Sequence, residues 1–204
     1  MGTRVLSLRE LAAAAVPTNE LWRDDLPRVL CFRIACEQMR KTTNGNMVEI
    51  YNQAIDSDDV AVMVWAWGRA PLPPSAIYRA AEAGALECLT YAREHGTSWH
   101  DLTTLAAAKA GSLPCLRYAH ENGAPWHVYT TAAAAGAGSL PCLRYAHENG
   151  APWDPDTIWH ALRVGSLPCL RYAHEQGAPW YRYRPLVCTH APDCLEYIRQ
   201  IGKY

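Results

Sequence analysis

Apolar residues in the second half of the chain recur at helical spacing within short segments. Leu113, Leu116 and Ala119 follow one another at intervals of three residues, which places them on one face of a helix. Ser112 precedes the segment and belongs to the residue types that cap helix N-termini. Gly123 follows it and tolerates the left-handed backbone that ends many helices. The pattern therefore predicts one amphipathic helix between Ser112 and Gly123.

The same segment occurs three times. The sequence GSLPCLRYAHENGAPW begins at Gly111 and again at Gly138, and GSLPCLRYAHEQGAPW begins at Gly165, so the repeat length is 27 residues. A shorter apolar run precedes each copy, and in TLAAAKAG and TAAAAGAG its alanines leave room for a neighbouring helix to pack closely. One such helix–turn–helix cannot bury its apolar face alone, whereas stacked copies form a continuous core. We therefore predict an all-α solenoid of stacked helix–turn–helix repeats.

The repeats divide the chain into two parts. The repeat domain is expected to span 46–204, with units near 46–73, 74–100, 101–127, 128–154, 155–181 and 182–204. The first of these units is degenerate, and we expect its helices near Met47–Ile55 and Asp58–Trp67. Residues 1–45 do not fit the repeat and are expected to form a helical cap that shields the first unit.

A short motif in each unit resembles the ankyrin repeat. In the second full unit this motif is Ala107-Ala108-x-x-Gly111, then Cys115-Leu116-x-x-Ala119, then Gly123-Ala124. The ankyrin repeat is about 33 residues long, and the deficit here follows the closing Gly-Ala, where that family places a β-hairpin. The chain resembles the short, Trp-ended ankyrin-like repeats of some protist and large-DNA-virus proteins. The resemblance implies truncated hairpin loops and a protein-binding role.

The N-terminal 45 residues allow a second interpretation. Leu26-Pro27 and the leucines around it resemble an F-box, a helical module often placed ahead of such repeats. An F-box would make the protein a substrate-recognition component of a ubiquitin ligase. The alternative is the helical cap, with no partner of its own.

Composition and charge narrow the classes of partner. Hydrophobic residues make up 50% of the chain and charged residues 19%, which is typical of a globular protein. The formal net charge of -1 gives no basis for binding nucleic acid, which needs clustered Lys and Arg. No apolar run approaches the roughly 18 residues that span a bilayer, so we expect no membrane insertion.

The cysteines follow the repeat. Cys88, Cys115, Cys142 and Cys169 are 27 residues apart and so occupy one site in successive units. Packed helices lie about 8–10 Å apart, whereas a disulfide needs Cα atoms about 4.4–6.8 Å apart. We therefore predict buried, reduced thiols in a reducing intracellular compartment, most simply the cytoplasm. Arg4 ahead of an Ala-rich run leaves an organellar transit segment as the alternative to an amphipathic N-terminal helix.

No constellation of residues predicts catalysis. Cys115 and His120 lie five residues apart, so their side chains diverge by roughly 140° around a helix and cannot share a metal. We expect the repeated histidine to interact with the carbonyls at its helix C-terminus. The row formed by Trp99, Trp126, Trp153 and Trp180 is expected to pack where the hairpin is missing, rather than to stack on bases. The chain is accordingly predicted to be non-enzymatic, with no metal and no cofactor.

The units differ mainly just after each Trp. These segments are HDLTTL at 100–105, HVYTTA at 127–132, DPDTIW at 154–159 and YRYRPL at 181–186. Uniform packing positions beside one varied edge are what a recognition scaffold would show, and rings and guanidinium groups are favoured at interfaces. We therefore predict a protein–protein interaction scaffold, either an adaptor or an accessory subunit of a larger assembly. Its expected partner-binding residues are Tyr129, Asp156, Trp159, Tyr181, Arg182, Tyr183 and Arg184.

Overall fold

The computed structural model of the chain describes residues 37, 40–41, 45–180 and 191–202. The expected cap or F-box at 1–45 lies outside these residues, apart from 37, 40–41 and 45. All regular elements in the described residues are α-helices, and they form successive pairs. The pairs are α3 (Met47–Asp56) with α4 (Val60–Trp67), α5 (Ala76–Ala83) with α6 (Leu86–Glu94), α7 (Thr103–Lys109) with α8 (Leu113–Glu121), α9 (Thr130–Gly136) with α10 (Leu140–Glu148), and α11 (Thr157–Val164) with α12 (Leu167–Glu175), followed by α13 (Pro192–Gln200).

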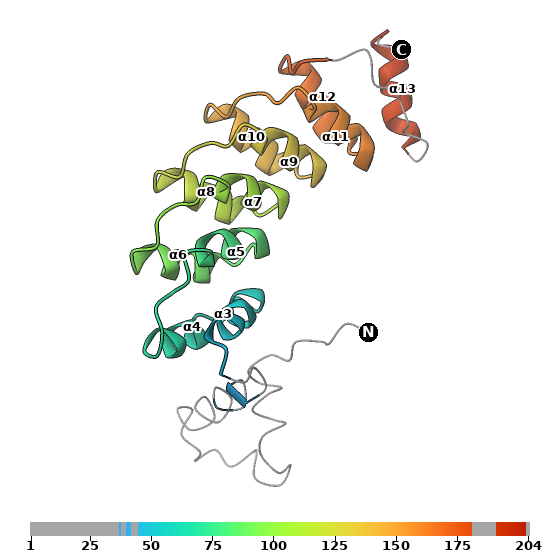
Figure 1. The fold of residues 1–204 in the computed structure, drawn as a ribbon. Helices are drawn as coiled ribbons and strands as arrows, with labels where there is room; N and C mark the ends of the chain where they lie inside the picture. Colours follow the sequence, from blue (N-terminus) through green and yellow to red (C-terminus); the bar gives the residue numbers. More distant parts are fainter. Residues whose placement is uncertain (1–36, 38–39, 42–44, 181–190, 203–204) are drawn as a thin grey trace, which may run out of the picture.

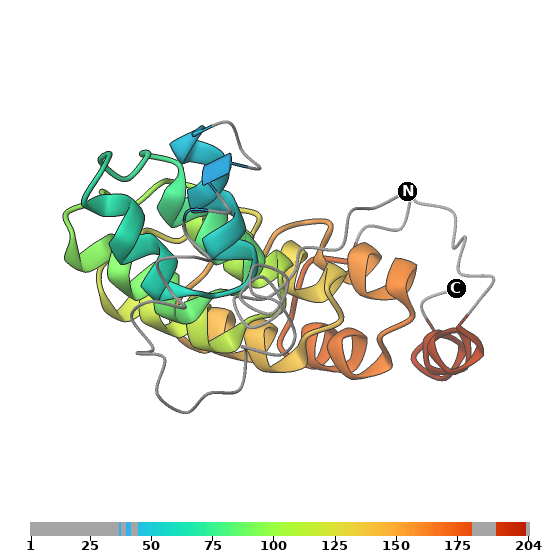
Figure 2. The same cartoon turned by 90° about the horizontal axis from the view of Figure 1, so that it is seen from below.

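The pairs stack into a curved row with two layers (Figure 1). The odd-numbered helices from α3 to α11 lie along the concave side, and the even-numbered helices from α4 to α12 lie along the convex side. Viewed from below, α13 lies beyond α12 at the end of the row (Figure 2). The predicted all-α solenoid is confirmed.

Local sequence determines where the helices begin and end. The Ser112 hydroxyl accepts a hydrogen bond from the Cys115 amide at 3.4 Å, and Gly123 has a φ of 88°, as the sequence predicted for the two ends of α8. The helix expected at Asp58–Trp67 begins at Val60 instead, because the Asp59 carboxylate accepts the amides of Ala61 and Val62.

Repeated small and branched residues build one core along the row. The alanine pairs of the concave helices are fully buried, which confirms that they allow close helix packing. The Leu and Cys of the convex helices from α6 to α12 are buried beside them, and the thiols are free (Ala80, Ala81, Ala107, Ala108, Ala134, Ala135, Cys88, Leu89, Cys115, Leu116, Cys142, Leu143, Cys169, Leu170).

Buried threonines join adjacent units where the ankyrin repeat has its hairpin. Thr104 donates its hydroxyl to the carbonyl of Pro125 at 2.9 Å and accepts the amide of His127 at 3.1 Å. Thr131 does the same one unit later, with Pro152 at 3.0 Å and Asp154 at 3.0 Å. The segments after each Trp are therefore varied only in part, because their threonines are fully buried, and Thr104 and Thr131 hold the turn that leads to the next unit.

The junction between the two helices of a unit also touches the next unit. Gly84 has a φ of 73°, and a Cβ atom there would lie 3.3 Å from the Cβ of Ser112, the cap of the following unit. In the first unit this position is Asp58, with a φ of 48°. Its carboxylate accepts the amide of Cys88 at 3.0 Å and so caps α6, which has Ala85 where the later units have Ser.

The repeated Trp, His and Tyr side chains form a ladder at the ends of the convex helices. Trp126 is half-buried and donates its indole N–H to the carbonyl of Asn149 in the next unit at 2.9 Å. The His120 ring stacks on Trp126 with centroids 4.4 Å apart. His120 lies in the last turn of α8 as expected, but its Nδ1 hydrogen-bonds with the Tyr145 hydroxyl at 3.0 Å rather than with a carbonyl of its own helix. The ladder thus fastens each unit to the next.

Candidate interaction surface

Two of the predicted partner-binding residues line one groove on the concave side. Tyr129 precedes α9 and its side chain is 56% exposed, while Asp156 precedes α11. Both border a groove of about 560 Å³ that crosses α7, α9 and α11. Its lining residues are Leu105, Lys109, Tyr129, Ala132, Ala133, Gly136, Ala137, Asp154, Asp156, His160 and Arg163.

Trp159 lies beside this groove without lining it. Its ring packs edge-on against His160 with centroids 4.9 Å apart, and the Arg163 guanidinium lies 5.6 Å from the ring centroid. Trp159 therefore supports two side chains of the groove wall. The remaining predicted residues, Tyr181, Arg182, Tyr183 and Arg184, lie outside the described residues.

The groove exists because one concave helix has only small outward residues. At the position of Leu105 and Trp159 in the neighbouring units, α9 has Ala132. At the position of Lys109 and Arg163 it has Gly136. The helices α7 and α11 therefore form the walls, and α9 forms the floor.

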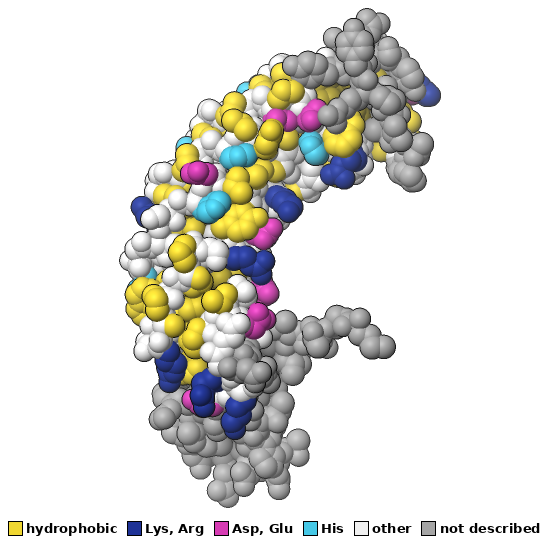
Figure 3. All heavy atoms as spheres, in the orientation of Figure 1, with side chains coloured by type: hydrophobic (Ala, Val, Ile, Leu, Met, Phe, Trp, Pro, Cys, Tyr) yellow, Lys and Arg dark blue, Asp and Glu magenta, His cyan; other side chains and the backbone are white. Residues whose placement is uncertain are grey.

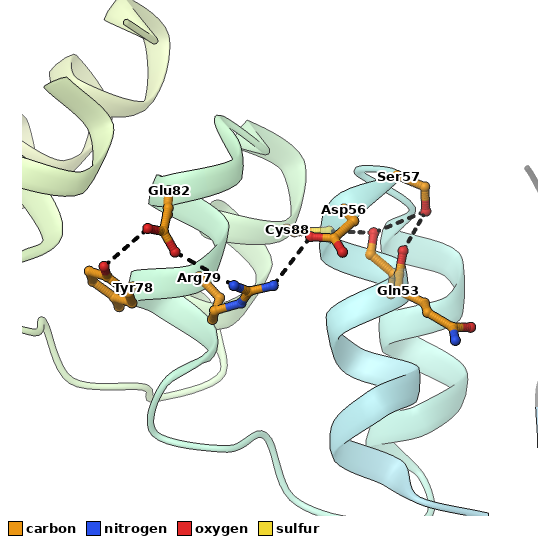
Figure 4. A network of polar contacts seen from close by, with 8 residues as sticks. Gln53, Asp56, Ser57, Tyr78, Arg79, Glu82 and Cys88 are labelled. Atoms are coloured by element: carbon orange, nitrogen blue, oxygen red, sulfur yellow. Dashed lines mark hydrogen bonds and ion pairs between the residues drawn. The ribbon is translucent and has the colours of Figure 1, made fainter. Parts of the chain in front are cut away.

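A row of charged side chains leads to the groove along the concave side. Arg79 contacts Asp56 and Glu82, each at 3.5 Å, and the Tyr78 hydroxyl donates to Glu82 at 3.2 Å (Figure 4). Glu82 also pairs with Lys109 at 3.6 Å. In the space-filling view, Lys, Arg, Asp and Glu side chains follow the concave edge (Figure 3). The charges of the first three units are thus paired with one another across the unit boundaries.

The sequence prediction missed three residues of the groove wall, Lys109, His160 and Arg163. They lie inside the first helices of their units, α7 and α11, and not in the varied segments after each Trp. An alignment of the concave helices at the 27-residue spacing would have indicated these residues. In that alignment, Lys109 and Arg163 are the residues equivalent to Gly136 in the two neighbouring units. The glycine marks the gap that the flanking side chains border.

Two further features bear on chemistry. Within the part of the chain that the structure describes, no three His, Cys, Asp or Glu side chains are grouped so that they could hold a metal ion. No helix of the described residues is both long and apolar enough to cross a bilayer.

The stacked helix pairs define the class of fold, an ankyrin-repeat solenoid. Among solved structures, the chain is similar to the ankyrin repeat domain of human ASB11, with a TM-score of 0.61 over 98% of both chains. The sequences are 16% identical, so this likeness concerns the fold. No protein-family model and no curated protein matches the chain.

Proposed function

We propose that the protein is a non-catalytic protein-interaction scaffold, acting as an adaptor or as an accessory subunit of a larger assembly. One observation carries the proposal. The buried positions repeat almost unchanged from unit to unit, whereas the outward positions of the concave helices differ and border one groove. A stack of near-identical units that presents a varied concave surface suits recognition of another macromolecule.

The residues at the groove have the character of an interface. Tyr129 offers an exposed ring, and Trp159 holds Arg163 by a cation–π contact. Tyr, Trp and Arg supply much of the binding energy in protein interfaces, because they bury large areas and also make polar contacts. We therefore propose Tyr129, Asp156 and Trp159 as binding residues. Tyr183 occupies the position of Asp156 one repeat later, and we extend the surface to 181–184 on that ground.

Charge and cysteine chemistry support the type of partner and the compartment. The near-neutral net charge of -1 favours a protein partner over nucleic acid. Five described cysteines are buried as free thiols, which favours a reducing compartment, the cytoplasm before an organelle.

Affinity purification with the full chain from its native source, followed by titration of the captured protein, tests this proposal. We expect Tyr129→Ala and Trp159→Ala each to weaken binding by about 1–2 kcal/mol, roughly 5- to 30-fold in Kd. Val64→Ala serves as the control, because Val64 is 49% exposed on the convex helix α4. If neither concave variant weakens binding while both retain the wild-type melting temperature, the proposed surface is wrong.

A further inference from the structure

The groove lies where α9 lacks the two large side chains that α7 has at the equivalent positions. Helix α7 has the sequence TTLAAAK and helix α9 has TTAAAAG, so the two differ only at Leu105 against Ala132 and at Lys109 against Gly136. Gly136 has an ordinary helical backbone, and a Cβ there would meet His160 Nδ1 at 3.4 Å, an ordinary contact distance. The fold therefore does not require either small residue, because α7 shows that the same helix accepts large ones.

The charges around the gap determine what fits it. Asp56, Arg79, Glu82 and Lys109 alternate in sign along the row and pair at 3.5–3.6 Å. The next position is Gly136, and beyond it lies the cation Arg163 in the last turn of α11. The groove is also lined by Asp154 and Asp156, but these carboxylates precede α11 and so lie at the opposite end of that helix from Arg163. A negative group between Lys109 and Arg163 would continue the alternation, whereas a positive group would face two cations.

The floor favours an apolar group beside that anion. Ala132, Ala133 and Gly136 present no polar side-chain atom, and Leu105 adds an apolar wall. The volume of about 560 Å³ falls within the range of roughly 300–1,000 Å³ that ligand sites occupy. The gap can therefore hold a large side chain together with an adjacent carboxylate.

We propose that this groove binds a partner segment that places an apolar side chain over Ala132 and Gly136 and a carboxylate between Lys109 and Arg163. The inference rests on the proposed scaffold function and specifies the chemistry of the partner. The carboxylate gains charge-assisted hydrogen bonds from the two cations, and the apolar side chain leaves water on contact with the alanine floor.

Three capped peptides provide the probe. The first is acetyl-Ala-Glu-Phe-Glu-Ala-amide, whose two glutamates present a carboxylate on either side of the ring. The other two carry Gln or Lys at both Glu positions. Each is titrated into the isotope-labelled full chain, and the amide signal of Gly136 is followed by NMR. We expect the Glu peptide to bind at least about tenfold more tightly than the Gln peptide, and the Lys peptide to bind least.

A variant that fills the gap tests the location. Ala132→Leu combined with Gly136→Gln fills the gap with side chains about as long as those of α7, without adding a third cation between Lys109 and Arg163. We expect it to abolish binding of the Glu peptide while retaining the wild-type melting temperature or exceeding it. Lys109→Gln leaves the gap open and is expected to weaken the Glu peptide by about tenfold without weakening the Gln peptide.

Three results would overturn the inference: no shift of the Gly136 signal with the Glu peptide, equal or tighter binding of the Lys peptide, or undiminished Glu-peptide binding to the filled variant. The scaffold function fails separately, when the captured partner binds Tyr129→Ala and Trp159→Ala as tightly as the wild type. If the peptides fail while Tyr129→Ala weakens partner binding, the scaffold function stands and the chemistry of the groove is wrong.

Discussion

At the scale of single residues, Asp58 replaces two residues of the later units at once. It occupies the left-handed position that is Gly84 in the next unit, and its carboxylate caps α6 in place of a serine hydroxyl. Asp tolerates the left-handed region better than most residues, because its short polar side chain bonds locally. Ala85 cannot cap α6 with its own side chain, and the Asp58 carboxylate takes the place of the serine hydroxyl. Asp58 and Ala85 therefore form a compensating pair.

The pair can be tested by replacement with the Gly–Ser pair of the later units. Asp58→Gly relieves the backbone but removes the cap, and we expect a loss of about 1 kcal/mol in the free energy of unfolding. Adding Ala85→Ser restores a cap as Ser112 does in the next unit, so the double variant should recover most of that loss. Urea denaturation measures both variants. Independent, additive effects of the two substitutions would contradict the pairing.

The buried cysteines are a second feature at the scale of single residues. They should make the free energy of unfolding depend on pH in the alkaline range. Burial raises the pKa of the Cys115, Cys142 and Cys169 thiols above the ordinary value of 9.0, although hydrogen bonds with Ser112, Ser139 and Ser166 partly offset this. Burial, followed by the charge of Asp58, raises the pKa of Cys88. These thiols keep their protons in the folded state when the unfolded chain has already lost them.

Ionisation of these thiols should therefore leave the free energy of unfolding unchanged below about pH 9 and lower it above that pH. The reason is that the unfolded state then binds fewer protons than the folded state. Each thiol contributes at most about 1.4 kcal/mol per pH unit. Urea denaturation between about pH 8 and about pH 10 compares the wild type with Cys142→Ala. The variant should be less stable at the lower pH but lose stability less steeply as pH rises. Parallel curves for the two proteins would contradict the argument.

At the scale of helices, the turn after each convex helix is held by rings rather than by a hairpin. Trp126 stacks on His120 of its own unit and bonds to the Asn149 carbonyl of the next unit. The stacking recurs with His147 and Trp153, whose centroids are 4.4 Å apart. The Trp126 ring is half-buried, so its contribution comes from stacking and one hydrogen bond as well as from burial.

Trp126→Ala and Trp126→Phe separate these contributions. We expect Trp126→Ala to cost about 2–3 kcal/mol in the free energy of unfolding, less than the roughly 3–5 kcal/mol for an enclosed aromatic side chain. Trp126→Phe retains a ring but loses the N–H donor, with an expected cost of about 0.5–1.5 kcal/mol. Thermal melts and urea denaturation check both values. Equal losses for the two variants would show that the hydrogen bond, and not the ring packing, dominates.

At the scale of the whole molecule, the described helices of each unit pack mainly on those of the neighbouring units in the row. The helices α7 and α9 pack on one another, as do α9 and α11, and the corresponding convex helices follow the same order. A solenoid of this kind gains stability from each unit and from each interface between neighbours. The Gly-Ser junctions at Gly111 and Gly138 have the same sequence on both sides, so we expect their local contacts to be interchangeable.

Deletion of residues 112–138 removes α8 and α9 and joins Gly111 to Ser139, which recreates the Gly-Ser junction of the intact chain. We expect the shortened protein to fold with an undiminished helical signal per residue in far-UV circular dichroism. Its urea m-value should fall roughly in proportion to the surface lost, because m scales with the area exposed on unfolding. Collapse of the helical signal would contradict the nearest-neighbour description. The deletion also removes the floor of the groove.

The sequence alone determined the features that depend on neighbours along the chain. The apolar period of Leu113, Leu116 and Ala119 places one face of α8 in the core, and Ser112 caps that helix through its own first turn. These predictions succeeded because helix geometry relates residues only a few positions apart. The repeat then extended one unit to the whole row, since identical segments meet identical neighbours.

Only the tertiary structure decided which residues of different units meet. The sequence singled out Tyr129 and Asp156, but not that Lys109 and Arg163 border the same groove. It also did not predict that Thr104 would replace hairpin contacts. These relations depend on how closely and at what register successive helix pairs stack, and that follows from the packing of buried side chains across the whole unit. The proposed recognition surface therefore depends on how the units stack, although the helices of each unit follow from the local sequence.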